Sequence, residues 1–331
     1  METLAARIVD AVPTASGPIL VRDRCGRCEL VDAVVAECLR RGLEPVVEHV
    51  DNALLRALIA STPVEALARW DLDREHDTER VSAAISLGGW PLDTGGLPPD
   101  SLVAWSAAAG RTETAIESRR VPTVVVAVPT VEVAGALGMT LRDLDAHVFP
   151  GVAGSATDLR TSVESLIDAL AASSTVEVRT ATGLLVAARG ARPLLVDDGV
   201  IDADDISAGA TVSNLPAGSV YWTVVEHETR GDVLLGDGSV LRFGEGGRLR
   251  DGAYAGERVA HIGIATNPMV TRTIGWTIVD EHRPGSVFLA LGENRYMGGA
   301  NESAINVDLL PASPTVKAGD ITLVTNGRLA V

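Results

Sequence analysis

The sequence predicts an α/β protein in which an amino-terminal, mostly parallel α/β domain precedes a β-rich α+β domain. Short apolar runs alternate with helix-spaced stretches in the first half, and from about residue 175 the period changes to two. Aromatic residues make up only 3% of the 331 residues, so the cores must be built from Ala, Val, Leu and Ile, which suits buried parallel strands. We place the boundary near residue 174, giving domains 1–174 and 175–331.

The first half predicts repeated βαβ units. In the first helix, Leu30, Val34 and Cys38 share one face. Pro122 and Pro129 stand at the two ends of the last strand, where a missing N–H does least harm. Strands are predicted over 17–22, 44–49, 81–87 and 123–128, and helices over 30–41, from about 52, over 64–70 and over 102–119. Strands alternating with helices indicate a mostly parallel sheet.

The second half predicts antiparallel sheet. A helix over about 156–172, with Leu159, Val163 and Leu166 at three- and four-residue steps, connects the halves. Tight turns such as Gly236-Asp237-Gly238 then separate short alternating runs, as in antiparallel sheet. These runs cover 176–178, 184–187, 220–225, 233–235 and 240–243.

Composition and charge exclude several classes of partner. The net charge of -16, with Lys317 the only lysine, disfavours binding to nucleic acid and to anionic membrane surfaces. No stretch approaches the roughly 20 apolar residues of a membrane span, and the start of the chain lacks the layout of a signal peptide. We therefore expect a cytoplasmic protein that acts on a small-molecule substrate.

The first domain offers little chemistry by motif. Cys25 and Cys28 form a lone Cys-x-x-Cys without the second pair that a structural zinc site needs, so we interpret them as reduced thiols. Gly88-Gly89 and Gly95-Gly96 lack the Lys-Ser/Thr of a phosphate-binding loop. Nucleotide binding therefore has no support from motifs.

Polar residues in the second domain gather in and beside predicted strands. Asn306 and Asp308 project from the same face of one strand, because strand side chains alternate. A buried carboxylate without a cation or donors is costly, so Asp308 is the strongest single functional candidate. Trp276 and Phe288, scarce aromatics in this chain, are candidates to wall a substrate pocket, with plain core positions as the alternative.

A series of motifs in the second half resembles the aminopeptidase T family of metallopeptidases, which includes leucyl aminopeptidase-like enzymes. In order, the motifs cover 214–218 (Asn-Leu-Pro-Ala-Gly), 263–268 (Gly-Ile-Ala-Thr-Asn-Pro), 280–285, 290–292 and 298–308. In the first half, Glu44-Pro45-Val46-Val47 agrees more loosely. The resemblance implies a carboxy-terminal domain of the aminopeptidase T type and a homodimer with a metal-binding cleft in each second domain.

Most of the ligand positions that the resemblance implies hold other residues. The family's two bridging glutamates fall on Ser219 and His261, and two of its ligand histidines fall on Phe288 and Asn306. Asp308 is retained, and Tyr296 matches the family's active-site tyrosine. A pair of metal ions would lose most of its charge compensation with these ligands.

The chain is also similar to the 2,5-dihydroxypyridine dioxygenases, a branch of the same superfamily with one Fe(II) held by two His and one Asp. That resemblance implies His261 and Asp308 as two ligands and Asn306 as the third, with an amide in place of an imidazole. It implies one divalent metal, iron or zinc, or no metal at all.

The other polar candidates have plain alternatives. Arg272 and Arg295 are the cations best placed by sequence to clamp a substrate carboxylate, with surface ion pairs as the alternative. His227 is expected in a solvated edge, and His282 at the exposed tip of a hairpin turn, with no role. Ser219 has no identifiable triad partners, so we place it among substrate-binding residues.

We therefore hypothesise a small-molecule-metabolising enzyme on an aminopeptidase T scaffold, with one metal ion or none. Tyr296, Asp308 and Glu302 are the candidates for acid–base work. Two alternatives stay open: an aminopeptidase that recruits Glu226, Glu281 or Glu293 as ligands, and a binding protein without catalysis.

Overall fold

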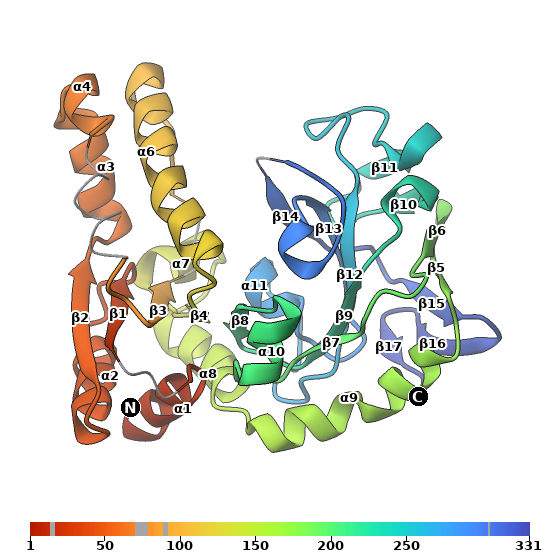
Figure 1. The fold of residues 1–331 in the computed structure, drawn as a ribbon, viewed down its shortest axis with the longest axis horizontal. Helices are drawn as coiled ribbons and strands as arrows, with labels where there is room; N and C mark the ends of the chain where they lie inside the picture. The colour runs from red at the N-terminus through yellow and green to blue at the C-terminus, as the bar shows by residue number, and fades with distance from the viewer. Residues whose placement is uncertain (14–16, 70–78, 89–91, 304) are drawn as a thin grey trace. The chain divides into compact units, whose positions relative to one another are not determined.

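The computed structural model describes residues 1–13, 17–69, 79–88, 92–303 and 305–331 (Figure 1). The chain divides into two compact units, each built from discontinuous segments. The first unit comprises 1–153, 200–207 and 211–215, and the second comprises 154–199, 208–210 and 216–331. The sequence predicted a boundary near residue 174, after the helix that connects the halves. The structure divides the chain between residues 153 and 154, before that helix.

The first unit is built on a parallel five-stranded sheet of order β2-β1-β3-β4-β8. Its strands are β1 (Pro18–Asp23), β2 (Glu44–His49), β3 (Ala83–Gly88), β4 (Thr123–Ala127) and β8 (Val212–Leu215). Fully buried aliphatic side chains fill β1, β3 and β4, which fits a sheet covered on both faces. The predicted parallel α/β architecture is therefore confirmed.

The helices of the first unit connect these strands. They are α1 (Glu2–Asp10), α2 (Cys28–Arg40), α3 (Asn52–Ser61), α4 (Val64–Leu67), α6 (Pro99–Ser118), α7 (Val131–Ala136) and α8 (Leu141–Val152). A further short helix, α10 (Ala203–Ala208), precedes β8. The predicted helix over 64–70 ends at Leu67, and residue 70 lies outside the described residues. No element was expected over 141–152, because Pro150 interrupts the helical pattern near its end.

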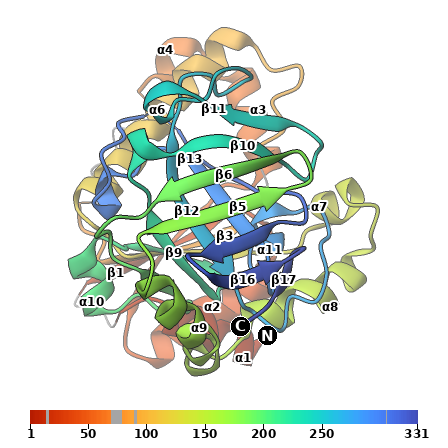
Figure 2. The ribbon, with the colours of Figure 1, turned by 90° about the vertical axis from the view of Figure 1, so that its right-hand side faces the viewer.

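The second unit packs two antiparallel sheets against each other. The seven-stranded sheet has the order β11-β10-β6-β5-β15-β16-β17, and the five-stranded sheet has the order β14-β13-β12-β9-β7. Figure 2 views this unit with β5 and β6 in front of β12. Side chains from both sheets and from α9 (Ala156–Ala171) share one core, which contains the fully buried Trp222.

The strand bounds of the second unit follow. In the larger sheet they are β5 (Thr175–Thr180), β6 (Gly183–Ala188), β10 (Arg230–Leu234), β11 (Val240–Phe243), β15 (Thr315–Ala318), β16 (Ile321–Thr325) and β17 (Arg328–Leu329). In the smaller sheet they are β7 (Leu195–Asp197), β9 (Ser219–Thr223), β12 (Val259–Ala265), β13 (Val287–Gly292) and β14 (Asn306–Leu309). The short helices are α11 (Thr277–Asp280), η1 (Glu226–Glu228), η2 (Glu245–Gly247) and η3 (Arg295–Met297).

Two further features concern membrane-spanning helices and the cysteines. Within the described ranges, no helix has the length and apolar content needed to cross a membrane. All three cysteines are free thiols, Cys25 and Cys38 buried and Cys28 exposed.

Candidate functional site

In the second unit, the five-stranded sheet β14-β13-β12-β9-β7 packs one face on the core. Its other face carries a row of polar side chains. In the strand register, His261 of β12 is paired with Ala290 of β13, and Ala290 is paired with Asp308 of β14. Residues aligned in this way project from the same face of a sheet. Because Ala290 ends at its methyl group, His261 and Asp308 meet above it from strands that are not neighbours.

His261 and Asp308 are the centre of this face. The Nε2 atom of His261 lies 3.4 Å from Oδ1 of Asp308, with the two side chains 9% and 33% exposed. Neither Nδ1 of His261 nor Oδ1 of Asp308 has a hydrogen-bond partner among the described residues. Two aromatic rings, Tyr221 and Phe288, lie 5.8 Å and 5.9 Å from the imidazole, the latter edge-on. The pair therefore has unused hydrogen-bonding capacity in an apolar surround, which a bound molecule can satisfy.

A second pair of titratable groups comes from the end of α11. The carboxylate of Asp280 accepts the backbone N–H groups of Ile274, Gly275 and Trp276, which fixes the turn into this helix. The chain then places Glu281 and His282 inside the unit, 5% and 2% exposed. Oε1 of Glu281 lies 3.4 Å from Nε2 of His282.

Burial favours the neutral forms of both of these groups. Desolvation, reinforced by the negative charges of Asp308 and Asp197, raises the pKa of Glu281 well above its ordinary value. Desolvation also lowers the pKa of His282, against the opposing effect of the same two aspartates. Although the short distance is that of an ion pair, we interpret the contact as one between neutral side chains. A carboxyl group that keeps its proton is a potential general acid.

A cavity of the second unit is lined in part by Asp308, although His261 is not among its lining residues. It has a volume of about 660 Å³, within the range typical of small-molecule sites. Asp280, Ser286 and Arg283 also line it. Nε of Arg283 is buried and has no hydrogen-bond partner in the described part of the chain, although its Nη2 donates to Gly327 O.

The structure brings several of the sequence-predicted residues to the polar face. Ser219 is 1% exposed, and in the strand register it lies opposite Asp197 of β7 and Ala265 of β12. Phe288 is 7% exposed, and its ring lies edge-on to the His261 ring. Asn306 donates from Nδ2 to the hydroxyl of Tyr296 at 2.8 Å, so these two candidates are joined.

Other predicted residues lie away from the His261–Asp308 pair. Arg295 forms a two-point contact with Glu293, at 2.9 Å and 3.1 Å, and a longer one with Glu302. The Glu302 side chain is 81% exposed. Arg272 is exposed in the loop before α11, and Trp276 is buried at the start of that helix. Nothing in these positions brings Arg295 or Glu302 to the imidazole.

Sequence reasoning was wrong about the surroundings of two residues. His282, expected at an exposed hairpin tip, is buried, because Asp280 closes a helical turn and not a hairpin. Glu226, expected on a solvated edge, is 4% exposed and accepts N–H groups from Asn294 and Ala300. For His282, the available signal of burial was the run Asp280-Glu281-His282 directly after an apolar turn. His227 is 70% exposed in its side chain, as expected.

The donor set does not fit a pair of metal ions. Across the described residues, no group of three or more His, Cys, Asp or Glu side chains is placed to hold a metal. His261 and Asp308 supply two donors, and Phe288 supplies none. Asn306 donates from Nδ2 to Tyr296, so it has only a neutral amide oxygen to offer a metal. Structural and catalytic zinc sites ordinarily have three or four protein ligands for each ion. The donors on this face are therefore too few for two metal ions.

Comparison with known proteins identifies the fold. No model of a protein family and no curated protein matches the sequence. The solved structures that match over the whole chain include wild-type AmpT (aminopeptidase T) from Thermus thermophilus and 2,5-dihydroxypyridine dioxygenase from Pseudomonas putida KT2440. The first has a TM-score of 0.73 at 18% identity and is covered over 98% of its length; the second has a TM-score of 0.60 at 13% identity and is covered over 96%.

Proposed function

We propose that this chain, which has the aminopeptidase T fold, is an enzyme that transfers protons on a small metabolite at the His261 site. Both structural neighbours are enzymes by name, which supports a catalytic scaffold. The observation that carries the proposal is the unsatisfied His261–Asp308 pair, together with the buried Glu281, whose pKa is raised by desolvation and by the charge of Asp308.

In the proposed reaction the imidazole of His261 accepts a proton from the substrate. Asp308 stabilises the imidazolium that forms, 3.4 Å away. Glu281 gives its proton to the substrate atom that gains negative charge, so the number of protons on substrate and enzyme together is unchanged. This balance fits an isomerisation or an elimination, and Tyr296 is placed by Asn306 as a further donor.

The test compares consumption of metabolites by wild type and by matched histidine variants. A metabolite mixture is incubated with protein and followed by mass spectrometry. We expect His261→Gln and Asp308→Asn to slow consumption about a hundredfold or more. His227→Gln, at an exposed histidine, is the matched control and should retain the wild-type rate. Equal rates for His261→Gln and His227→Gln would refute the proposal.

Elemental analysis of the purified protein tests the metal-free part of the proposal. We expect consumption to survive dialysis against a chelator. Two metal ions per chain, together with hydrolysis of aminoacyl chromogenic substrates after zinc, cobalt or manganese is added, would identify an aminopeptidase and overturn it. One iron with oxygen-dependent turnover would overturn it in favour of a dioxygenase.

The proposal includes a cytoplasmic homodimer, of which the dimer rests on the resemblance to the aminopeptidase T family alone. Light scattering at micromolar concentration tests the dimer, with a monomer mass as the contrary result.

A further inference from the structure

A second cavity lies entirely within the first unit, at the carboxyl ends of its parallel strands. Its volume is about 380 Å³. Arg24 and Cys25 follow β1, Asp51 follows β2, Gly88 ends β3, and Val128 follows β4. The sheet order β2-β1-β3 places β2 and β3 on opposite sides of β1, which is the point where such sheets bind ligands.

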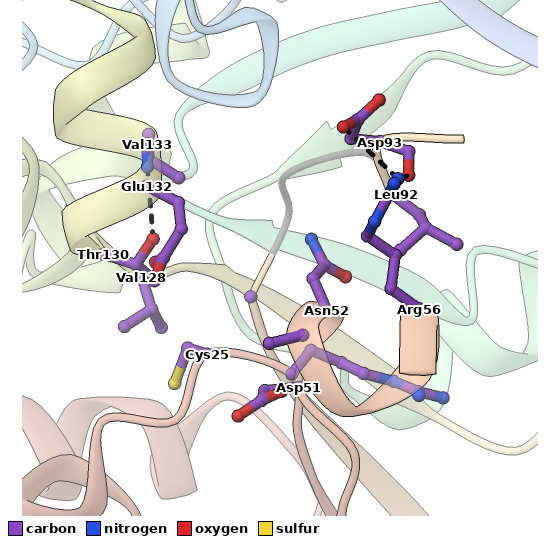
Figure 3. A pocket seen from close by; sticks show the side chains of 13 residues that line it. Cys25, Asp51, Asn52, Arg56, Leu92, Asp93, Val128, Thr130, Glu132 and Val133 are labelled. Atoms are coloured by element: carbon purple, nitrogen blue, oxygen red, sulfur yellow. Dashed lines mark hydrogen bonds and ion pairs between the residues drawn. The ribbon is translucent and has the colours of Figure 1, made fainter. Parts of the chain in front are cut away.

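The crevice between β1 and β3 depends on a glycine. A Cβ atom at Gly88 would lie 2.8 Å from Cβ of Arg24, closer than side chains tolerate. Figure 3 shows Thr130 and Glu132 on one wall and Asn52 and Arg56 on the facing one.

Sites at this position commonly bind phosphate through backbone N–H groups, but here the protein's own side chains occupy those donors. Asp23 Oδ1 accepts the N–H groups of Cys25 and Gly26 after β1. Asp51 accepts the Leu54 N–H at the start of α3 at 2.7 Å. Thr130 accepts the Val133 N–H at the start of α7. An anion would therefore meet carboxylates where it needs free donors.

The charges of the lining also favour a cation. Both arginines are paired, Arg24 with Glu48 at 3.2 Å and Arg56 with Asp93 at 3.3 Å. In the described part of the chain, no ion pair is formed by the other two acidic lining residues, Asp51 and Glu132. The lining holds the two arginines and three carboxylates, Asp51, Asp93 and Glu132, so its formal charge is negative. The remaining walls are largely apolar, with Leu92, Val128 and Val133.

We propose that this cavity is a binding site for a small organic amine with an apolar body. The ammonium group pairs with Asp51 and Glu132, and the hydrocarbon part packs on Leu92 and the valines. All lining residues belong to the first unit, and the proposal does not depend on the function proposed for His261.

The test uses three probes with one carbon skeleton and different head groups: isopentylamine, isopentanol and isovalerate. Binding to the full chain is measured by saturation-transfer NMR and calorimetry at millimolar concentrations. We expect the amine to bind, the alcohol to bind more weakly and the carboxylate not to bind. Failure of the amine to bind, or equal binding of isovalerate, would overturn the proposal.

Variants locate the binding. Asp51→Asn keeps a good helix cap while removing the charge, and Glu132→Gln changes an exposed side chain, so both should fold. Each should weaken amine binding about tenfold. Ala53→Trp, at an exposed lining position, should fill the cavity and abolish binding, whereas Ala57→Trp on the same helix but outside the lining should not. Unchanged amine affinity in Ala53→Trp would place the amine elsewhere.

Discussion

At the scale of single residues, the small size of Ala290 is what lets the candidate site exist. Adjacent strands lie about 4.8 Å apart, so β12 and β14 are separated by twice that spacing. His261 and Asp308 bridge this distance only because the residue between them, fully buried Ala290, has no side chain beyond Cβ. The geometry of the pair is therefore controlled by a residue that takes no part in chemistry.

Ala290→Val should separate the pair. The two added methyl groups enter the space where His261 and Asp308 meet, and overpacking costs about 1–3 kcal/mol of unfolding free energy. We expect metabolite consumption to fall about tenfold or more, measured as in the test of His261→Gln. Ala290→Gly is the matched control: it destabilises the strand but leaves the gap open, so its rate should stay near that of wild type. Equal losses in both variants would show that stability alone matters.

Burial of Glu281 predicts a dependence of stability on pH. The pKa of Glu281 is higher in the folded state than in the unfolded state. Its contribution to the unfolding free energy is therefore fully present at low pH, and it is lost as the pH rises from 4.5 through the raised pKa. Each unit of that shift corresponds to about 1.4 kcal/mol. The Glu281→Gln variant lacks this carboxyl group. Its unfolding free energy, relative to that of wild type, should therefore increase as the pH rises from about 5 to about 9.

Urea unfolding at the two pH values checks this prediction. His282 contributes in the opposite sense, since its lowered pKa costs stability as pH falls below 6.5. Because His282 contacts Glu281, its effect differs between the two proteins at low pH, and the change in the difference above pH 6.5 is the one that reports on Glu281. A constant difference in unfolding free energy between wild type and Glu281→Gln across the range would contradict the raised pKa.

At the scale of elements, strands β12 and β13 pack closely at Gly263, where the lack of a side chain leaves room for a neighbouring ring. The strand register pairs Gly263 with Phe288, and a Cβ atom on the glycine would overlap the phenyl ring. The ring also lies edge-on to His261. One glycine therefore sets the position of the aromatic wall of the candidate site.

Gly263→Ala should destabilise the protein by about 1–3 kcal/mol, because the Phe288 ring must leave its place. The measurement is the midpoint of urea unfolding. In the double variant Gly263→Ala/Phe288→Ala the ring is absent, so the alanine should cost much less than it does in the wild-type background. If the two substitutions are strictly additive, the two residues are not in conflict and the prediction fails.

Periodicity predicted most strands and helices, since apolar spacing follows directly from burial. It missed α8, where Pro150 lies inside the helix and interrupts the pattern, and it interpreted 280–285 as a hairpin. In the site, Asp308, His261 and Asn306 were predicted from strand alternation and from the family resemblance. Their alignment was not predictable, because a bulge between Val259 and His261 shifts the register of β12 against β13. Burial of Glu281 and His282 depends on Asp280, whose three backbone partners lie in a loop without periodicity.

At the scale of the whole molecule, the charge of -16 opposes compactness. Raising the salt concentration from about 10 mM to about 150 mM shortens the screening length from about 30 Å to about 8 Å. We expect the melting temperature to rise by a few degrees over this range, in NaCl and KCl alike. Differential scanning calorimetry measures it. A fall in melting temperature would mean that attractive ion pairs outweigh the general repulsion.

The position of β8 has a consequence for how the protein is made. This strand comes from residues 212–215 but pairs with β4, which ends at Ala127. While a ribosome is still synthesising the intervening segment, the nascent first unit displays β4 as an open edge, with unpaired N–H and C=O groups on a strand rich in valine. Slow translation between these points would prolong exposure of that edge and favour capture by chaperones or by other nascent chains.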